Sequence, residues 1–157
     1  MSDNSMQINP VYIKSVELEN YGPCKSFKYN FRFDDKGNPI PLILIGKNGS
    51  GKTIILSHIV NALITAKQMI YDNSEVEKGK VYKYRSSNYI NSGSLYSYSR
   101  VEFTKDNSAV TEWQLIDKKE ILIKNHNLNI SNPEWMNIPN NETDYYLQRS
   151  TLLQQNI

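Results

Sequence analysis

A glycine-rich run of eight residues constrains this chain more than any other feature. Residues 46–53 read Gly-Lys-Asn-Gly-Ser-Gly-Lys-Thr, the complete pattern of a Walker A phosphate-binding loop. The run follows an apolar segment, residues 41–45, and precedes residues 52–67, where apolar side chains recur at helical spacing. We therefore predict a buried strand, the loop, and then a helix with one buried stripe. The stripe consists of Ile55, Leu56, Ile59, Val60 and Leu63.

The residue types in this run suit the binding of phosphate. Its glycines allow positive φ angles and a close approach of the backbone to an anion. Amide groups at the start of a helix favour negative charge. We expect Lys52 to reach the β- and γ-phosphates of a nucleotide and the hydroxyl of Thr53 to coordinate Mg²⁺. The predicted site consists of Gly46, Lys47, Asn48, Gly49, Ser50, Gly51, Lys52 and Thr53.

The composition bounds the domain count and the compartment. A length of 157 residues suits one domain, and the formal net charge of +2 does not by itself indicate a nucleic-acid partner. One cysteine excludes an internal disulfide, and the N-terminus lacks the features of a signal peptide. No apolar run approaches the roughly 20 residues that span a bilayer. We expect a cytoplasmic protein without membrane contact.

Two further strands are expected before the loop. Residues 12–19 are bounded by turn residues, and residues 27–33 alternate aromatic with polar side chains, as in a half-buried strand.

Regular pattern is weaker after the helix. Residues 71–99 are rich in Ser, Asn, Tyr and Lys, which predicts an exposed, flexible polar insertion. Residues 97–104 and 110–116 flank a polar turn and predict a hairpin. Residues 120–124 suggest one more strand, and residues 144–153 a short helix.

This layout resembles the N-terminal lobe of the SMC/RecF-like ABC ATPases, which include DNA-repair, OLD-type and anti-phage defence ATPases. The similar parts are the turn at residues 20–23, the strand at 27–33 and the Asn-Gly-Ser-Gly-Lys-Thr core, within residues 11–67. The resemblance implies an α/β fold, with a mixed β-sheet around one P-loop helix and an antiparallel β subdomain.

The same resemblance implies that the chain is one partial P-loop ATPase domain with four parts. Strands, loop and helix take residues 11–70, and the insertion takes 71–99. A β-hairpin subdomain takes 100–125, and an irregular C-terminal part takes 126–157.

Two motifs that the resembled family needs for hydrolysis are missing from the sequence. A Walker B segment has four apolar residues and then Asp-Glu, and its carboxylates hold Mg²⁺ and polarise water. The nearest run, residues 113–118, contains Gln114 and ends in Lys118 where glutamate belongs. No two glycines are adjacent, which excludes the Leu-Ser-Gly-Gly signature. The simplest account is that this chain is the N-terminal part of a longer machine.

The resemblance also implies cofactors and partners. The cofactors are ATP and Mg²⁺, and the partners are the C-terminal half of the ATPase and a second subunit, as a homodimer. DNA is an implied partner of the full assembly, in DNA maintenance or phage defence. Alone, the chain is expected to bind ATP weakly and to hydrolyse it negligibly.

Several other residues are of types that occur in nucleotide or metal sites. Lys25, beside the first inter-strand turn, is a candidate phosphate contact, against a solvated lysine. Candidates for the glutamine that senses the γ-phosphate are Gln148, Gln154 and Gln155. His58 and His126 have no second ligand at metal spacing, and Cys24 has no histidine nearby, so we expect structural roles for all three.

One segment carries a hint of nucleic-acid binding. Its tyrosines could stack on bases while neighbouring cations meet phosphates. They are Tyr82, Tyr84, Tyr89, Tyr96 and Tyr98, interleaved with Lys80, Lys83, Arg85 and Arg100. A solvated insertion or a protein-contact surface is favoured, because no recognisable binding module surrounds them.

Two other functions are open from the sequence. A small P-loop kinase would alternate strands and helices and carry an arginine-bearing lid, whereas this chain turns β-rich after one helix and has four arginines. A regulatory or interaction module would use nucleotide binding to set its shape, without hydrolysis.

Overall fold

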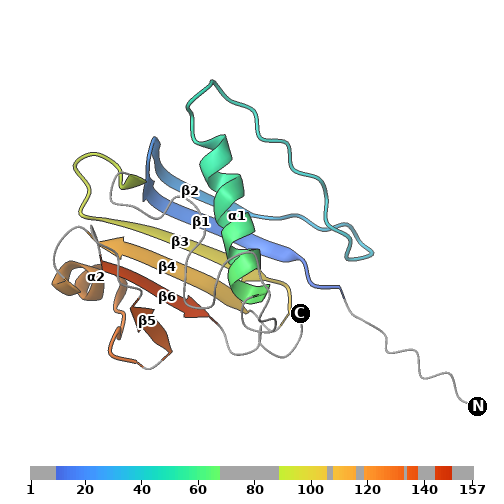
Figure 1. Ribbon diagram of the computed structural model, residues 1–157. Coiled ribbons are helices and arrows are strands. Elements are labelled where there is room, and N and C mark those ends of the chain that lie inside the picture. Colours follow the sequence, from blue (N-terminus) through green and yellow to red (C-terminus); the bar gives the residue numbers. More distant parts are fainter. Residues whose placement is uncertain are drawn as a thin grey trace, which may run out of the picture.

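The computed structural model describes residues 10–67, 89–105, 108–115, 119–132, 134–137 and 144–149. Figure 1 shows helix α1 crossing one face of a sheet, with α2 near the far end of the same sheet. In chain order the elements are β1 (Ile13–Tyr21), β2 (Cys24–Asn30), α1 (Lys52–Lys67), β3 (Tyr96–Phe103), β4 (Ala109–Leu115), α2 (Lys119–His126), β5 (Trp135–Asn137) and β6 (Asp144–Arg149).

The six described strands form one sheet in the order β2-β1-β3-β4-β6-β5. Every pair of neighbours in this order is antiparallel. The expected mixed sheet is therefore corrected to an antiparallel one for the described strands. Short connections join β1 to β2 and β3 to β4, and such connections produce antiparallel neighbours.

The main core lies between α1 and the inner face of the sheet, which is the face that α1 covers. Val16 and Leu18 of β1 are fully buried there. The other buried apolar residues of this core are Tyr21, Ile55, Ala62, Ala66, Val101, Phe103, Val110 and Leu147. Strands that precede α1 in the sequence and strands that follow it both contribute apolar side chains to this core. These contacts hold α1, and the loop before it, against the sheet.

The bounds predicted for the first helix are confirmed, and its predicted buried stripe is confirmed in part, since Ile55 is buried and Ile59 packs against the core. The structure buries Ile55, His58, Asn61, Ala62, Thr65 and Ala66. Leu56, Val60 and Leu63 are instead exposed. Most of the helix side chains that face the sheet are small or polar, and three larger apolar side chains lie on the exposed side of the helix.

A left-handed residue near the end of β1 changes which face the strand presents. Strict alternation would put Tyr21 on the outer face of the sheet, with Glu17 and Glu19. Asn20 has a φ of 59°, an angle that Asn adopts more readily than most residues. Tyr21 therefore points inward, and its ring lies 4.1 Å from that of His58 on α1.

The strand predicted at residues 41–45 is wrong for the described structure. These residues join no strand ladder, and Ile43 and Ile45 are 79% and 91% exposed. A short apolar run indicates that a segment can form a β-strand. The strand also needs a neighbouring strand to pair with, and the described residues do not supply one here.

Three further predictions are corrected. The hairpin predicted over residues 97–104 and 110–116 is confirmed as β3 and β4, so residues 96–99 are not part of the insertion, and residues 68–88 lie outside the described residues. Residues 120–124 belong to α2, where Glu120 in the first turn and Lys124 in the last turn suit the helix dipole. Residues 144–149, expected to be helical, form β6, and with β5 they add strands to the part expected to be irregular. Pairing with β4 overrides the local pattern there.

No helix within the described part of the chain is long and apolar enough to cross a membrane.

Candidate functional site

The glycine-rich loop joins an exposed extended segment to the start of α1. Gly49 and Gly51 have φ angles of 78° and 96°, which favour glycine. The Ser50 amide donates to the Lys47 carbonyl at 3.2 Å, which closes a turn inside the loop. These angles turn the chain sharply just before the helix, as a phosphate-binding loop requires.

The start of α1 is electrostatically suited to an anion. The helix begins at Lys52, and its first turn carries no acidic residue. A Cβ added at Gly46 would lie 2.8 Å from Ser50 Oγ, so a larger residue there would require the Ser50 side chain to move. Unpaired amides and the helix dipole thus meet an exposed loop without a competing carboxylate.

Lys52 folds back over the loop that precedes it. Its ammonium donates to the carbonyl oxygens of Gly46 at 2.7 Å and Lys47 at 2.8 Å. These bonds hold the positive charge across the mouth of the loop. Thr53 is exposed in the first turn of α1, beside this ammonium in sequence. The structure thus brings together all eight predicted residues, 46–53.

A turn between β1 and β2 forms a wall of the loop. A Cβ added at Gly51 would lie 3.5 Å from Cys24 Cβ and 3.6 Å from Pro23 Cγ. A Cβ added at Gly22 would lie 2.9 Å from Ile54 Cδ1 on α1. The sequence singled out residues 20–23 as a turn but gave no sign of this contact, since the two parts lie almost 30 residues apart.

The other candidate residues lie in different places. Lys25 is exposed on β2, next to Cys24, and its phosphate contact stays a prediction. Gln148 pairs with Thr111 and Trp135 on the outer face of the sheet, opposite α1, and its Nε2 donates to Glu134 Oε2 at 3.4 Å. The structure therefore does not bring Gln148 to the loop. Gln154 and Gln155 lie outside the described residues.

Cys24 and His58 are both packed against other side chains. Cys24 is half-buried, and this burial raises the pKa of its thiol. A raised pKa keeps a thiol protonated and less nucleophilic at neutral pH. His58 is fully buried beneath α1 against Tyr21. Both residues occupy packing positions.

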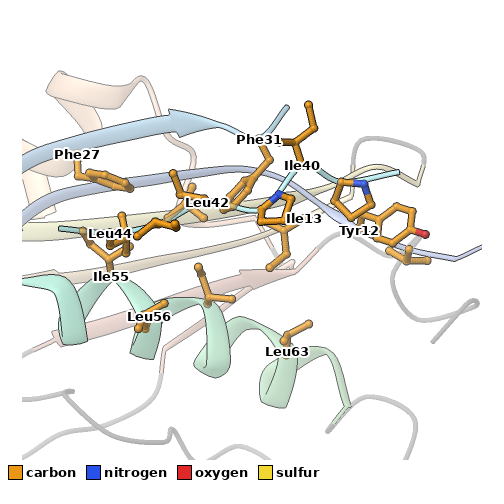
Figure 2. Close-up of a pocket in the computed structure, with 16 residues that line it drawn as sticks. Tyr12, Ile13, Phe27, Phe31, Ile40, Leu42, Leu44, Ile55, Leu56 and Leu63 are labelled. Atoms are coloured by element: carbon orange, nitrogen blue, oxygen red, sulfur yellow. The ribbon is translucent and has the colours of Figure 1, made fainter. Parts of the chain in front are cut away.

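An apolar groove of about 800 Å³ runs beside the loop. Figure 2 shows its two sides, with residues 40–44 and strands β1 and β2 facing helix α1. Leu42, Leu44, Ile55, Leu56, Ile59 and Leu63 are among the residues that line it. Exposed apolar surface of this kind commonly marks a site of interaction.

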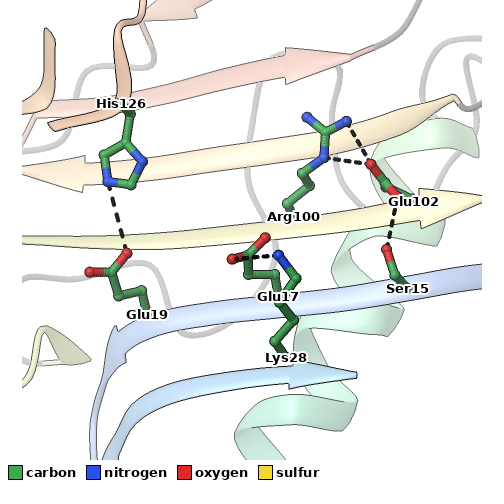
Figure 3. Close-up of polar contacts among 7 residues, drawn as sticks. All are labelled: Ser15, Glu17, Glu19, Lys28, Arg100, Glu102 and His126. Carbon is green, nitrogen blue, oxygen red and sulfur yellow. Dashed lines mark hydrogen bonds and ion pairs between the residues drawn. The ribbon is translucent and has the colours of Figure 1, made fainter. Parts of the chain in front are cut away.

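The outer face of the sheet carries a chain of polar contacts, drawn in Figure 3. Arg100 donates to Glu102 Oε1 at 2.8 Å, and Ser15 Oγ donates to Glu102 Oε2 at 2.9 Å. Lys28 lies 3.4 Å from Glu17. These contacts use the guanidinium of Arg100, which the sequence offered as a phosphate contact.

A second cluster on this face encloses His126. Its ring lies 4.1 Å from Trp113 and 5.4 Å from Tyr98, and its Nε2 is 3.8 Å from Glu19 Oε2. Burial lowers the pKa of His126, although Glu19 and Glu17 oppose the shift. Burial and a hydrogen bond to Glu19 raise the pKa of Tyr96 to about 12.

The hint of base stacking is therefore wrong for two of the tyrosines. Tyr98 is buried against Trp113, and Tyr96 packs on Trp113 and His126. Tyr82 and Tyr84 lie outside the described residues.

Comparison with known proteins adds one finding. A family model for the AAA domain matches residues 15–156, a range that contains the loop, both helices and all the described strands except the start of β1. No curated protein matches the sequence.

Proposed function

Because this chain belongs to the AAA domain family, whose members are nucleotide-binding, ATPase-type domains, we propose that it binds ATP with residues 46–53. The observation that carries the proposal is the loop itself. Two glycines at positive φ turn the chain into the start of α1, and Lys52 lies across the mouth of the turn.

The residues of the loop fit a nucleoside triphosphate with Mg²⁺. The space beside Gly46 would be filled by any side chain, and the first helical turn carries no carboxylate to repel an anion. Lys52 would exchange its two carbonyl partners for phosphate oxygens, since the loop is exposed to competing ligands. Thr53 would hold Mg²⁺ through its hydroxyl, and the metal when bound would neutralise charge on the β- and γ-phosphates.

We further propose that the lobe is of the SMC/RecF-like ABC type and that hydrolysis requires groups from outside these 157 residues. The sequence has no Walker B run and no Leu-Ser-Gly-Gly signature. In the resembled family these groups come from a C-terminal half and from a second subunit. The proposed partners are therefore these two, with DNA bound by the complete assembly in DNA maintenance or phage defence.

The apolar groove supports the proposal that further polypeptide packs beside the loop. Leu42 and Ile43 remain exposed, and they line the groove together with exposed Leu56 and Leu63 of α1. Covering such surface is favourable by roughly 25 cal/mol per Å². A packed C-terminal half would cover it and would lie close enough to the loop to add catalytic groups.

The described element order gives no support to the kinase alternative. A small kinase alternates strands with helices, and this chain instead places hairpins on either side of α1. The regulatory alternative shares the binding site and differs in outcome. It would give nucleotide-dependent binding of a partner without hydrolysis, even with the complete protein.

The test is calorimetric titration of the chain with MgATP. We expect weak binding that is lost in Lys52→Ala and kept in Lys36→Ala, an exposed lysine in the turn at residues 34–38. Steady-state hydrolysis should be negligible. Absence of binding by the unaltered chain would refute the ATP site, and rapid turnover abolished by Lys52→Ala would refute the composite site.

A further inference from the structure

We propose that Asn91 is a positioning residue for the phosphate loop, although it lies almost 40 residues after that loop in sequence. The inference rests on the proposed binding of ATP at residues 46–53. Asn91 would act through the turn at residues 20–23, which forms the wall beside Gly51, and would not touch the nucleotide itself.

Three hydrogen bonds connect this turn to residues 89–91. The side-chain Nδ2 of Asn91 donates to the Gly22 carbonyl at 2.7 Å. The backbone amide of Asn91 donates to the Asn20 carbonyl at 2.8 Å, and the Gly22 amide donates to the Tyr89 carbonyl at 2.6 Å. The side chain of Asn91 thus adds a third bond to two that the backbone makes.

The turn needs such restraint because of its backbone angles. Asn20 and Gly22 have φ angles of 59° and 50°, both in the left-handed region. Asn adopts this region more readily than most residues, but a residue other than glycine still stays there at a cost that surrounding contacts offset. Without the Asn91 side chain, the Gly22 carbonyl loses a part-buried donor, and the turn is freer to relax.

A displaced turn would disturb the loop directly. A Cβ added at Gly51 would be in van der Waals contact with Cys24 and Pro23, and a Cβ added at Gly22 would displace the tip of Ile54. Gly51 also accepts the bond from the Ile55 amide, an early hydrogen bond at the start of α1. Movement of the turn would therefore change the amides that are proposed to hold phosphate.

Asn91→Leu tests the role, because leucine has a similar volume and no donor. Loss of one hydrogen bond is expected to weaken MgATP binding about fivefold. Cys24 is the one cysteine of the chain, follows the turn directly and is half-buried, so its rate of alkylation reports the mobility of the turn. Alkylation should be faster in Asn91→Leu than in the unaltered chain, and MgATP should slow it.

Ser15→Ala is the matched control. It removes another part-buried side-chain hydrogen bond, to Glu102, on the face opposite α1. It should lower stability while leaving the MgATP dissociation constant and the alkylation of Cys24 unchanged. Equal weakening of MgATP binding in Ser15→Ala and Asn91→Leu would refute a positioning role, because binding would then simply follow stability.

Asn91→Asp is the second variant, and it serves if Asn91→Leu does not fold. It keeps the shape of the side chain but points a carboxylate at the Gly22 carbonyl. Unchanged MgATP binding and unchanged alkylation in the folded variants would overturn the inference while the ATP site stands. Failure of the unaltered chain to bind MgATP would instead count against the proposed function.

Discussion

Gly49 and Gly37 have nearly the same φ angle in two different turns of the chain. Their φ angles are 78° and 80°, and a Cβ added to either would meet no atom within 4 Å. Alanine at either position therefore costs only the strain of a left-handed angle, about 1–2 kcal/mol. The two glycines differ in surroundings, since Gly49 lies in the phosphate loop and Gly37 in the turn at residues 34–38.

This pair provides a controlled test of the loop. Gly49→Ala and Gly37→Ala should lower the free energy of unfolding by similar amounts in urea titrations. Gly49→Ala alone should weaken MgATP binding, because it changes the angles that direct the loop amides. Equal affinities in the two variants would mean that the loop tolerates a different backbone conformation at position 49.

The turn into α1 at residues 46–53 could be predicted because its pattern is local, and phosphate binding there stays a prediction read from the residue types. The wall of the site could not be predicted. Asn91 and Gly22 lie 69 residues apart, and no periodicity in the sequence relates them. The inward turn of Tyr21 depends on the left-handed angle of Asn20, which a sequence permits without requiring.

At the scale of elements, α2 is anchored through His126. Its ring lies among Tyr96, Tyr98 and Trp113 on the outer face of the sheet. Burial lowers its pKa below the ordinary value of 6.5, against the opposing effect of nearby Glu19 and Glu17. The folded state thus binds a proton at His126 less readily than the unfolded state does.

The sign of the pH dependence follows from this lowered pKa. The contribution of neutral His126 to stability should be complete above about pH 6.5 and should decline as pH falls toward the folded pKa. Urea midpoints at pH 7.5 and 5.5 should therefore differ more in the unaltered chain than in His126→Gln. An identical difference in both proteins would show that His126 has the same pKa in the folded and unfolded states.

Elements with a strong local pattern were predictable, and elements defined by their partners were not. The spacing of apolar residues located α1, and the flanking turn residues located β1. Residues 41–45 and 120–124 are both short apolar runs, and a run of five residues does not distinguish strand from helix. The first needs a partner strand that the described residues do not supply, and the second became part of α2.

At the scale of the whole molecule, the groove beside the loop leaves one side of α1 uncovered. Leu63 lines this groove, while Leu95 lies outside it, and both are 46% exposed. The two leucines therefore separate the effect of the groove from the effect of exposed apolar surface in general.

A dye that binds apolar surface should detect the groove. The chain is expected to enhance the fluorescence of anilinonaphthalene sulfonate, and Leu63→Gln should reduce the signal more than Leu95→Gln. Each substitution should change the free energy of unfolding by no more than about 0.5 kcal/mol, since both positions are on the surface. Equal signals from the two variants would show that the dye binds elsewhere.

The pairing of β1 with β3 has a consequence for the order of assembly. It joins distant parts of the chain, as in the bond from the Tyr12 amide to Thr104 Oγ1 across 92 positions. Closing so long a loop carries a large entropic cost and slows folding. The glycine-rich loop belongs to the segment between β1 and β3. Asn91, shortly before β3, donates a hydrogen bond to Gly22 in the turn beside that loop. If the proposed nucleotide site forms only after this closure, bound nucleotide is expected to slow unfolding and to leave the rate of folding almost unchanged.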